Sequence, residues 1–261
     1  TLTVTGTSYD NEYDANVHGT AASVNVTEGT KVSYKVGEDG KWTEEVPTIK
    51  DVGSKEVTVK AENPNYETAE DRYTLTVTPK AVTVTADDKS KVYGEADPEL
   101  TAAVSGTIGN DTVTYSLSRA KGEAVGDYVI TASGEAEQGN YTVTYSPGTL
   151  TITKNGTLTV TGTSYDNEYD ANVHGTAASV NVTEGTKVSY KVGEDGKWTE
   201  EVPTIKDVGS KEVTVKAENP NYETAEGRYT LTVTPKAVTV TAENKSKVYG
   251  EADPKLTAVV S

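Results

Sequence analysis

The sequence predicts an all-β chain of small tandem β-sandwich modules, Ig-like or β-grasp-like, arranged as an elongated rod. Three observations predict this fold class. Short runs in which Thr, Ser or Lys alternates with Val, Leu or Tyr recur along the chain, and a period of two indicates a strand with one buried and one solvated face. No stretch keeps the 3.6-residue period of a helix. The chain also repeats itself almost unchanged, which is typical of a tandem array.

The repeat is long and nearly perfect. Residues 1–105 recur as residues 157–261 with only five substitutions. Four of the five involve charged or polar residues, as expected for solvated surface. The five are Asp71 to Gly227, Asp87 to Glu243, Asp88 to Asn244, Glu99 to Lys255 and Ala103 to Val259.

Each repeat divides again into two related halves. Both halves open on an alternating strand, pass a Tyr-containing turn and an Asn-Tyr pair, and close on a second alternating strand. Short strands separated by Gly, Asn, Asp and Pro favour a sandwich over a βαβ fold. We therefore predict an A module over 1–78, a B module over 79–156, a second A module over 157–234 and a partial second B module over 235–261.

The linkers between modules are short. Pro79 lies between the first A and B modules, and its fixed φ stiffens that linker. Asn155 and Gly156 follow the B module, and this pair favours a turn. Short linkers between small modules predict the rod.

Composition excludes several classes of function. The 261 residues carry a net charge of −16 and a pI near 4.6, whereas nucleic-acid binding needs a basic surface. No run of 18 apolar residues is present, so we expect no membrane insertion. The lack of Cys excludes disulfides and thiol catalysis. The chain opens without a basic–apolar signal segment, as expected of a mature or internal fragment. The acidic charge favours solubility and a monomeric repeat array.

The A module resembles a known repeat family. Its segment Tyr13–His18, followed by Asp51-Val52-Gly53 and Asn63–Tyr66, resembles the YDG-type repeats of bacterial surface proteins. Those repeats usually read Tyr-Asp-Gly at the first motif, and here Ala15 replaces the Gly.

The B module resembles a second family. Lys91–Pro98, Val125–Tyr128 and Asn140–Val143 are similar to the MBG domain of the YGX type, found in mucin-binding-like proteins of Gram-positive cell walls. The two resemblances imply an extracellular location at the bacterial cell surface, with wall anchoring through a region not in this chain. They also imply adhesion, with host glycan or mucin as the partner, and bring no catalytic residue.

No catalytic site is expected, so we predict that the chain is not an enzyme. The only histidines are His18 and His174. Asp14 and Ser23 lie near His18 in sequence, but no nucleophile-elbow motif accompanies them. A turn or edge histidine is the preferred interpretation.

No metal or cofactor is expected either. The run Asp10, Asn11, Glu12 and Asp14 is rich in the oxygen ligands that calcium prefers. It lacks the EF-hand spacing, so a solvated acidic loop is preferred and calcium stays an alternative. A Lys–Asn isopeptide cross-link is a further alternative, although the first strand of the A module has no Lys.

Trp42 and its copy Trp198 have two possible positions. A two-residue turn at Asp39-Gly40 pairs Gly37 with Trp42 and exposes the indole as a stacking platform for sugar. A three-residue turn with Gly40 left-handed pairs Val36 with Trp42 and buries it. Asp-Gly fits both turns, and we favour the buried position.

Two functions follow from these observations. The preferred one is a structural stalk whose repeats set how far a distal binding region projects. The alternative is a multivalent arm in which each A module binds glycan weakly and repetition supplies avidity. Its candidate ligand-binding residues are Trp42, Tyr9, Tyr13 and Trp198.

Overall fold

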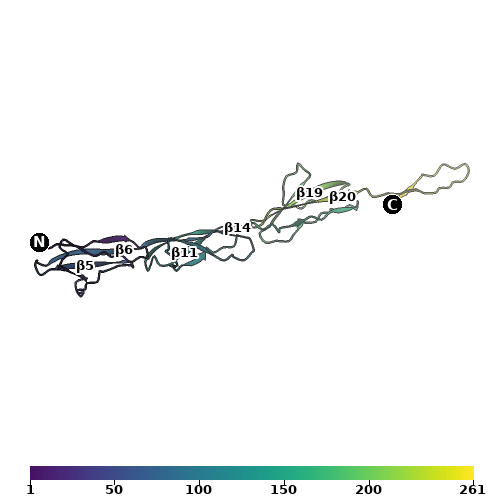
Figure 1. The fold of residues 1–261 in the computed structure, drawn as a ribbon. Helices are drawn as coiled ribbons and strands as arrows, with labels where there is room; N and C mark the ends of the chain where they lie inside the picture. Colours follow the sequence, from purple (N-terminus) through teal and green to yellow (C-terminus); the bar gives the residue numbers. More distant parts are fainter. The chain divides into compact units, whose positions relative to one another are not determined.

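The computed structural model describes residues 1–261, and all of its regular structure is β (Figure 1). This confirms the predicted all-β chain of tandem β-sandwich modules. The chain has no helix. Accordingly, no helix is long and apolar enough to cross a membrane. The chain forms two compact units, one of Thr1–Lys91 with Glu95–Ile152 and one of Val92–Gly94 with Thr153–Ser261.

The A module of the first unit has a four-stranded sheet and a two-stranded sheet. The large sheet has the order β2-β6-β5-β4, with β2 parallel to β6 and the other pairs antiparallel. The small sheet pairs β1 with β3. The strands are β1 Val4–Thr5, β2 Tyr9–Glu12, β3 Ser23–Val24, β4 Lys31–Val36, β5 Gly53–Glu62 and β6 Ala69–Thr78.

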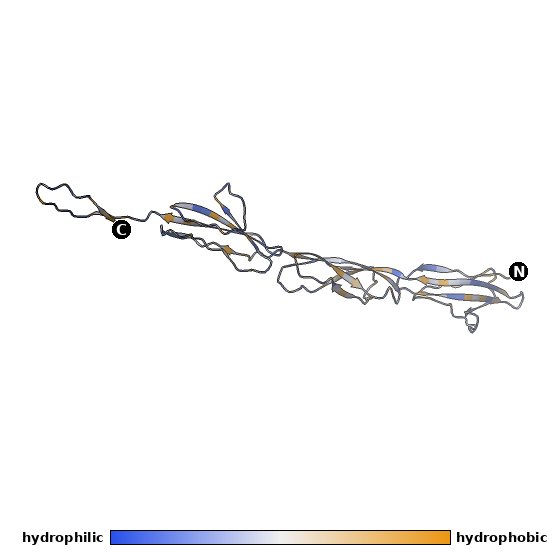
Figure 2. Cartoon of the chain, turned by 180° about the vertical axis from the view of Figure 1, so that it is seen from behind, coloured by the Kyte–Doolittle hydropathy of each residue, from blue (hydrophilic) through white to orange (hydrophobic).

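The core of this module follows from the alternation along β5 and β6. Val57, Val59, Ala61 and Leu75 are completely buried, while the residues between them face outward. Figure 2 shows the resulting hydrophobic and hydrophilic bands along the strands. Burying one such side chain contributes roughly 1.5–3 kcal/mol. The repeated burial pattern therefore fixes the register of the sheet.

The B module has two four-stranded sheets. Their orders are β10-β11-β14-β8 and β12-β13-β7-β9. Val82, Val84, Ile130, Leu150 and Ile152 form the buried centre. The strands are β7 Lys80–Ala86, β8 Lys89–Val92, β9 Ala102–Ser105, β10 Ser116–Arg119, β11 Gly126–Ser133, β12 Glu137–Gln138, β13 Tyr141–Ser146 and β14 Gly148–Thr153.

The second A module repeats the first in the second unit. Its large sheet has the order β16-β20-β19-β18, and β15 pairs with β17. Its core again centres on completely buried valines and one leucine, Val213, Val215 and Leu231. The strands are β15 Val160–Thr161, β16 Tyr165–Glu168, β17 Ser179–Val180, β18 Lys187–Val192, β19 Gly209–Glu218 and β20 Ala225–Thr234.

Residues 235–261 form a two-stranded hairpin. Strand β21 (Val240–Ala242) pairs with β22 (Ala258–Val260), and no third strand joins them. Val240 is 66% exposed, whereas its counterpart Val84 in the complete B module is fully buried. The difference arises because β7, which contains Val84, lies between β13 and β9. The segment therefore has no partner sheet within the chain.

Candidate interaction sites

Trp42 follows a hairpin whose register differs from both sequence-based alternatives. The N–H of Tyr34 donates to the C=O of Thr43 over 2.7 Å, and the reverse bond measures 2.9 Å. Both alternatives instead pair Thr43 with a residue closer to the turn, Lys35 or Val36. The left-handed residue is Gly37, with φ +71°, and not Gly40. A turn longer than either predicted one therefore sets the position of the indole.

The indole of Trp42 lies at the surface. It is 38% exposed, so the prediction of a core position is wrong. The Nζ atoms of Lys60 and Lys35 lie 4.8 and 5.7 Å from the ring centroid, within the range of cation–π attraction. Trp198 repeats this arrangement, with Lys216 at 4.9 Å and Lys191 at 5.6 Å.

Tyr9 belongs to a different cluster. Its ring stacks on the ring of His18 with centroids 4.2 Å apart. The Nε2 atom of His18 lies 2.8 Å from Oδ1 of Asp14. The hydrogen bond from His18, helped by those from Asn16, lowers the pKa of Asp14 to about 2. The His18 ring therefore covers one face of the Tyr9 ring.

The turn after Tyr9 contains an unusual backbone conformation. Ala15 has φ +65°, and its copy Ala171 has the same value. This left-handed region costs a residue with a Cβ roughly 1–2 kcal/mol. The resembling YDG-type motif has Gly at this position, and the observed φ gives the physical reason for that Gly.

Tyr13 is not an exposed ligand anchor. It is 5% exposed and packs edge to face on Tyr141 of the B module, with centroids 5.6 Å apart. Oδ2 of Asp111 accepts a hydrogen bond of 2.6 Å from Tyr141 and a longer one of 3.5 Å from Tyr13. The interpretation of Tyr13 as part of a sugar-binding surface is therefore wrong, because the B module covers it.

Further contacts join the two modules of the first unit. The side chain of Asn140 accepts a hydrogen bond from the N–H of Val52 over 2.8 Å and donates to Asp51 over 3.0 Å. Lys80 pairs with Glu12 across the linker, with an Nζ–Oε1 distance of 2.6 Å. Asn140 belongs to B, whereas Asp51, Val52 and Glu12 belong to A. Glu12 and Asn140, which precede Tyr13 and Tyr141 in sequence, thus add polar contacts between the modules.

The B module also contains an ionic cluster around one buried lysine. The Nζ of Lys91, whose side chain is almost fully buried, lies 2.7 Å from Asp97 and 2.6 Å from Glu123. Arg119 bonds both carboxylates as well. Its guanidinium, followed by the Lys91 ammonium, lowers the pKa of Asp97 to about 2. Buried charges persist only when paired in this way.

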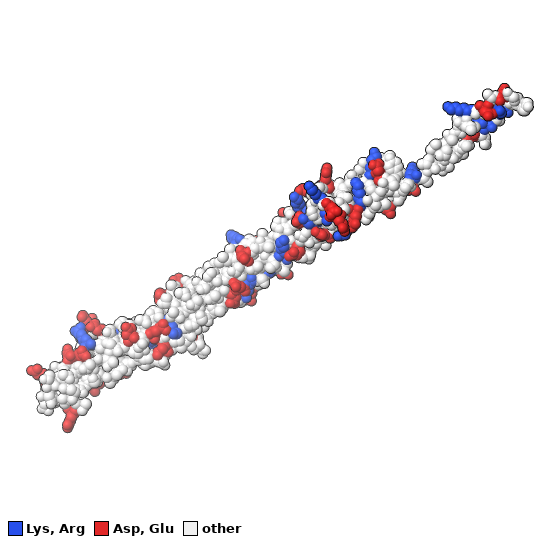
Figure 3. All heavy atoms as spheres, turned by 90° about the horizontal axis from the view of Figure 1, so that it is seen from above, with Lys and Arg blue, Asp and Glu red and all other residues white.

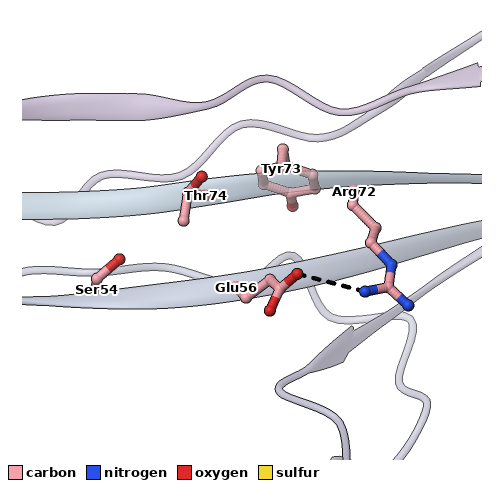
Figure 4. A pocket seen from close by; sticks show the side chains of 5 residues that line it. All are labelled: Ser54, Glu56, Arg72, Tyr73 and Thr74. Carbon is pink, nitrogen blue, oxygen red and sulfur yellow. Dashed lines mark hydrogen bonds and ion pairs between the residues drawn. The ribbon is translucent and has the colours of Figure 1, made fainter.

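The A module has an open polar hollow on its sheet. Ser54, Glu56, Arg72, Tyr73 and Thr74 line it (Figure 4). Arg72 pairs with Glu56 over 3.4 Å. Acidic and basic side chains are interspersed on the face of the molecule seen in Figure 3. The hollow is shallow and open, unlike the enclosed apolar pockets that hold small molecules.

The positions of the acidic residues do not support the alternative of a calcium site. Asp10, Asn11 and Glu12 lie on strand β2, where successive side chains point to opposite faces. No three acidic or histidine side chains come together in a group that could hold a metal ion. A Lys–Asn isopeptide cross-link needs a lysine side chain beside an asparagine. The side chain of Lys80, at the start of β7, instead pairs with Glu12.

The candidate residues thus occupy three separate environments. Trp42 and Trp198 lie beside lysines, Tyr9 lies against His18, and Tyr13 is buried under the B module. Sequence analysis missed Lys35 and Lys60, although alternation along β4 and β5 places both on the outward face. It also missed Asn140 and Asp111, whose partners lie far away in sequence.

The comparison with protein families decides the type of repeat. Residues 82–151 and 238–261 match the MBG domain (YGX type). The chain carries MBG-like repeats. The MBG match covers most of the B module and the partial second B module, and it supports a surface-protein repeat domain. No curated protein matches the chain. The resemblance of the A module to YDG-type repeats and the module boundaries stay predictions.

Several solved structures align with most of this chain at low identity. Drosophila N-cadherin EC1-4 is 13% identical, with 90% of this chain and 73% of that chain covered and a TM-score of 0.31. An I-band fragment of titin is 13% identical, with 90% and 97% covered and a TM-score of 0.33. A glucan-utilisation protein of Bacteroides ovatus in complex with a heptasaccharide is 14% identical, with 95% and 72% covered and a TM-score of 0.23. These scores are too low to imply a shared ligand or activity.

Proposed function

We propose that the chain is a non-catalytic stalk segment of an extracellular bacterial surface protein, in which the repeats set the reach of a distal binding region. The observation that carries this proposal is the contact between the A and MBG-like modules of the first unit. The ring contact of Tyr13 with Tyr141 and the hydrogen bond from Tyr13 to Asp111 join the modules, and Tyr141 bonds the same carboxylate from within its own module. Such a contact restricts the motion of one module against the next.

The surrounding contacts support the same role. Only Pro79 separates strands β6 and β7, and proline removes one backbone rotation. The amide of Asn140 and the ion pair of Lys80 with Glu12 add polar connections between the modules. A spacer needs modules that hold their orientation, and these contacts supply that property.

Nuclear spin relaxation of the full chain tests the proposal. We expect the A and MBG-like modules of the first unit to reorient with one common correlation time. The double variant Tyr13→Ala and Asn140→Ala should give each module its own, shorter correlation time. Tyr169→Ala, at the equivalent position of the second A module, is the matched control. Independent reorientation in the unmodified chain would contradict the proposal.

A second candidate function is weak binding of acidic glycan or mucin by each A module. The exposed indole of Trp42 lies beside the ammonium groups of Lys35 and Lys60, and Trp198 repeats this pattern. Aromatic faces stack on sugar rings, and ammonium groups attract sulfate or carboxylate substituents. The two lysines already interact with the indole, which weakens this candidate relative to the stalk.

Binding of the full chain to sulfated and sialylated glycans separates the two functions. The stalk predicts no specific binding. The second candidate predicts binding that is lost in the double variant Trp42→Ala and Trp198→Ala, and retained when the distant Tyr115 is changed to Ala. Saturable binding with this pattern would favour the glycan-binding arm.

A further inference from the structure

An edge of the second A module is covered by residues that end the MBG-like module. Within the second unit, the N–H of Asn155 donates to the C=O of Asn221 over 3.0 Å. The C=O of Asn155 accepts from the N–H of Glu223 over 2.9 Å. Asn155 and Tyr222 form a parallel β-bridge. One residue therefore satisfies two backbone groups of the edge.

A tyrosine completes this contact. The ring of Tyr93 packs edge to face on Tyr222, with centroids 5.4 Å apart. The side-chain amide of Asn155 donates to the C=O of Tyr93 over 3.0 Å. The N–H of Tyr93 donates to the C=O of Thr153 over 2.9 Å. Tyr93 and Asn155 therefore hold each other in place against the edge.

The first unit contains an equivalent contact. There Lys80 pairs in parallel with Tyr141, and the N–H of Lys80 donates to the C=O of Asn140 over 3.0 Å. Tyr13 packs on Tyr141 as Tyr93 packs on Tyr222. In each unit, a turn tyrosine and the second residue after a closing strand thus meet the Asn-Tyr edge of the next module.

The same edge of the first A module is uncovered. The two A modules differ only at Asp71 and Gly227, so Asn65, Tyr66 and Glu67 correspond to Asn221, Tyr222 and Glu223. Tyr66 is 43% exposed. Neither the C=O of Asn65 nor the N–H of Glu67 forms a hydrogen bond within the chain. The edge thus presents one unpaired donor and one unpaired acceptor beside an aromatic ring.

We propose that the Asn65–Glu67 edge is a docking surface for the end of an MBG-type module. The occupant supplies a closing strand followed two residues later by an Asn, whose backbone pairs with the C=O of Asn65 and the N–H of Glu67. It also supplies a Tyr-Gly turn, whose ring packs on Tyr66. The proposal rests on the contacts seen at Asn221–Glu223 and is independent of the proposed stalk function.

The docking surface distinguishes between the two module types. At the A–B contact, Asp111 of the MBG-like module accepts the hydroxyl of Tyr13 and Lys80 pairs with Glu12. At Asn221–Glu223, the occupant uses Asn155 to hold its own Tyr93. An A-type end carries Lys80 in place of Asn155 and lacks this internal hydrogen bond. We therefore expect the edge to accept an MBG-type end and to discriminate against an A-type end.

Hydrogen exchange in a lengthened chain tests the proposal. The lengthened chain places a copy of residues 79–156 directly before Thr1 of the full sequence. Exchange of the Glu67 amide is compared with that of Glu223 by mass spectrometry. Peptides that reach position 71 or 227 are distinguishable, because Asp71 and Gly227 differ in mass. In the original chain, Glu67 should exchange at least about tenfold faster than Glu223.

In the lengthened chain, the Glu67 amide should slow by about tenfold and match Glu223. Changing the added copies of Tyr93 and Asn155 to Ala should remove this protection, while amides in the added copy of β13, followed in peptides that extend to the changed position 155, confirm that the added module remains folded. A chain lengthened with residues 1–81 instead, which ends in Lys80 and Ala81 where the MBG-type addition ends in Asn155 and Gly156, should leave Glu67 unprotected. Unchanged exchange of Glu67, or equal protection by the A-type addition, would overturn the proposal.

Discussion

The rings of Tyr13 and Tyr141 meet edge to face with centroids 5.6 Å apart, although 128 positions separate them. Their hydroxyls share one acceptor, the carboxylate of Asp111. Burial, followed by the neighbouring Asp111 carboxylate, raises the pKa of Tyr141. The phenol therefore remains a hydrogen-bond donor at neutral pH, and the contact has a specific geometry.

The first prediction concerns the hydroxyl of Tyr141. Tyr141→Phe removes its bond to Asp111 and leaves the N–H of Ile108 without its acceptor. We expect a loss of about 1.5–3 kcal/mol in the free energy of unfolding of the first unit, the range for hydrogen bonds to charged groups. Guanidinium unfolding of the full chain measures it. Tyr115→Phe, at an exposed tyrosine, is the control and should change little.

The second prediction uses the left-handed conformation of Ala15. Ala15→Gly removes the steric cost of the Cβ at φ +65°. The greater freedom of glycine in the unfolded chain offsets part of the gain, so we expect about 0.5–1 kcal/mol of net stabilisation. Thermal unfolding of Ala15→Gly and of the matched Ala171→Gly should show the same upward shift. A lower melting temperature in either variant would contradict the strain argument.

The third prediction concerns a buried hydroxyl. Tyr73 OH and its copy Tyr229 OH are buried without a hydrogen-bond partner. Tyr73→Phe removes an unpaired polar atom and keeps the ring, so we expect no loss of stability or a gain of about 1 kcal/mol. Denaturant unfolding measures it. A loss above 1 kcal/mol would show that a water molecule pairs with the hydroxyl.

The fourth prediction revises the energetic role of Trp42. A fully buried tryptophan would cost about 3–5 kcal/mol on truncation to Ala. Because the indole is 38% exposed, Trp42→Ala should cost only about 1–2 kcal/mol, from lost partial burial and the lysine contacts. Trp198→Ala is the matched test in the second unit. A loss above 3 kcal/mol for either variant would restore the core interpretation.

The fifth prediction is a dependence of stability on acid. Asp97 has a folded-state pKa of about 2, below its ordinary value of 3.8, because Arg119 and Lys91 stabilise its charged form. A depressed folded pKa contributes stability above pH 4 that disappears as the pH falls from about 4 to 2. Melting temperatures of the full chain across this range should fall. Asp97→Asn should melt lower at pH 7 and show a weaker decline, and equal declines would exclude Asp97 as the cause.

Local alternation along the chain is enough to predict the fold, because each buried residue of β5 and β6 alternates with an exposed one. The position of Trp42 could not be predicted in this way. Its side of the sheet depends on the length of one turn, and a shift of one residue reverses the face. The left-handed residue is Gly37 rather than Gly40, and Gly fits both positions equally.

The environment of Tyr13 was also beyond local reasoning. Tyr13 and Tyr169 have identical neighbours in sequence, yet Tyr13 is buried and Tyr169 is half-buried. The difference comes from Tyr141 and Asp111, which lie about one hundred residues away from Tyr13 in the chain. A pattern within the A module contains no information about these partners.

The parallel pairing of β2 with β6 has a mechanical consequence for the A module. Tyr9–Glu12 pairs with Leu75–Thr78 in the same direction, and Thr78 is followed at once by the linker. A pulling force applied at the two ends of the module therefore acts along both strands in opposite senses. It loads their evenly spaced hydrogen bonds together in shear, so they do not open one after another. The short β1–β3 pair can peel away under tension while the main sheet stays closed.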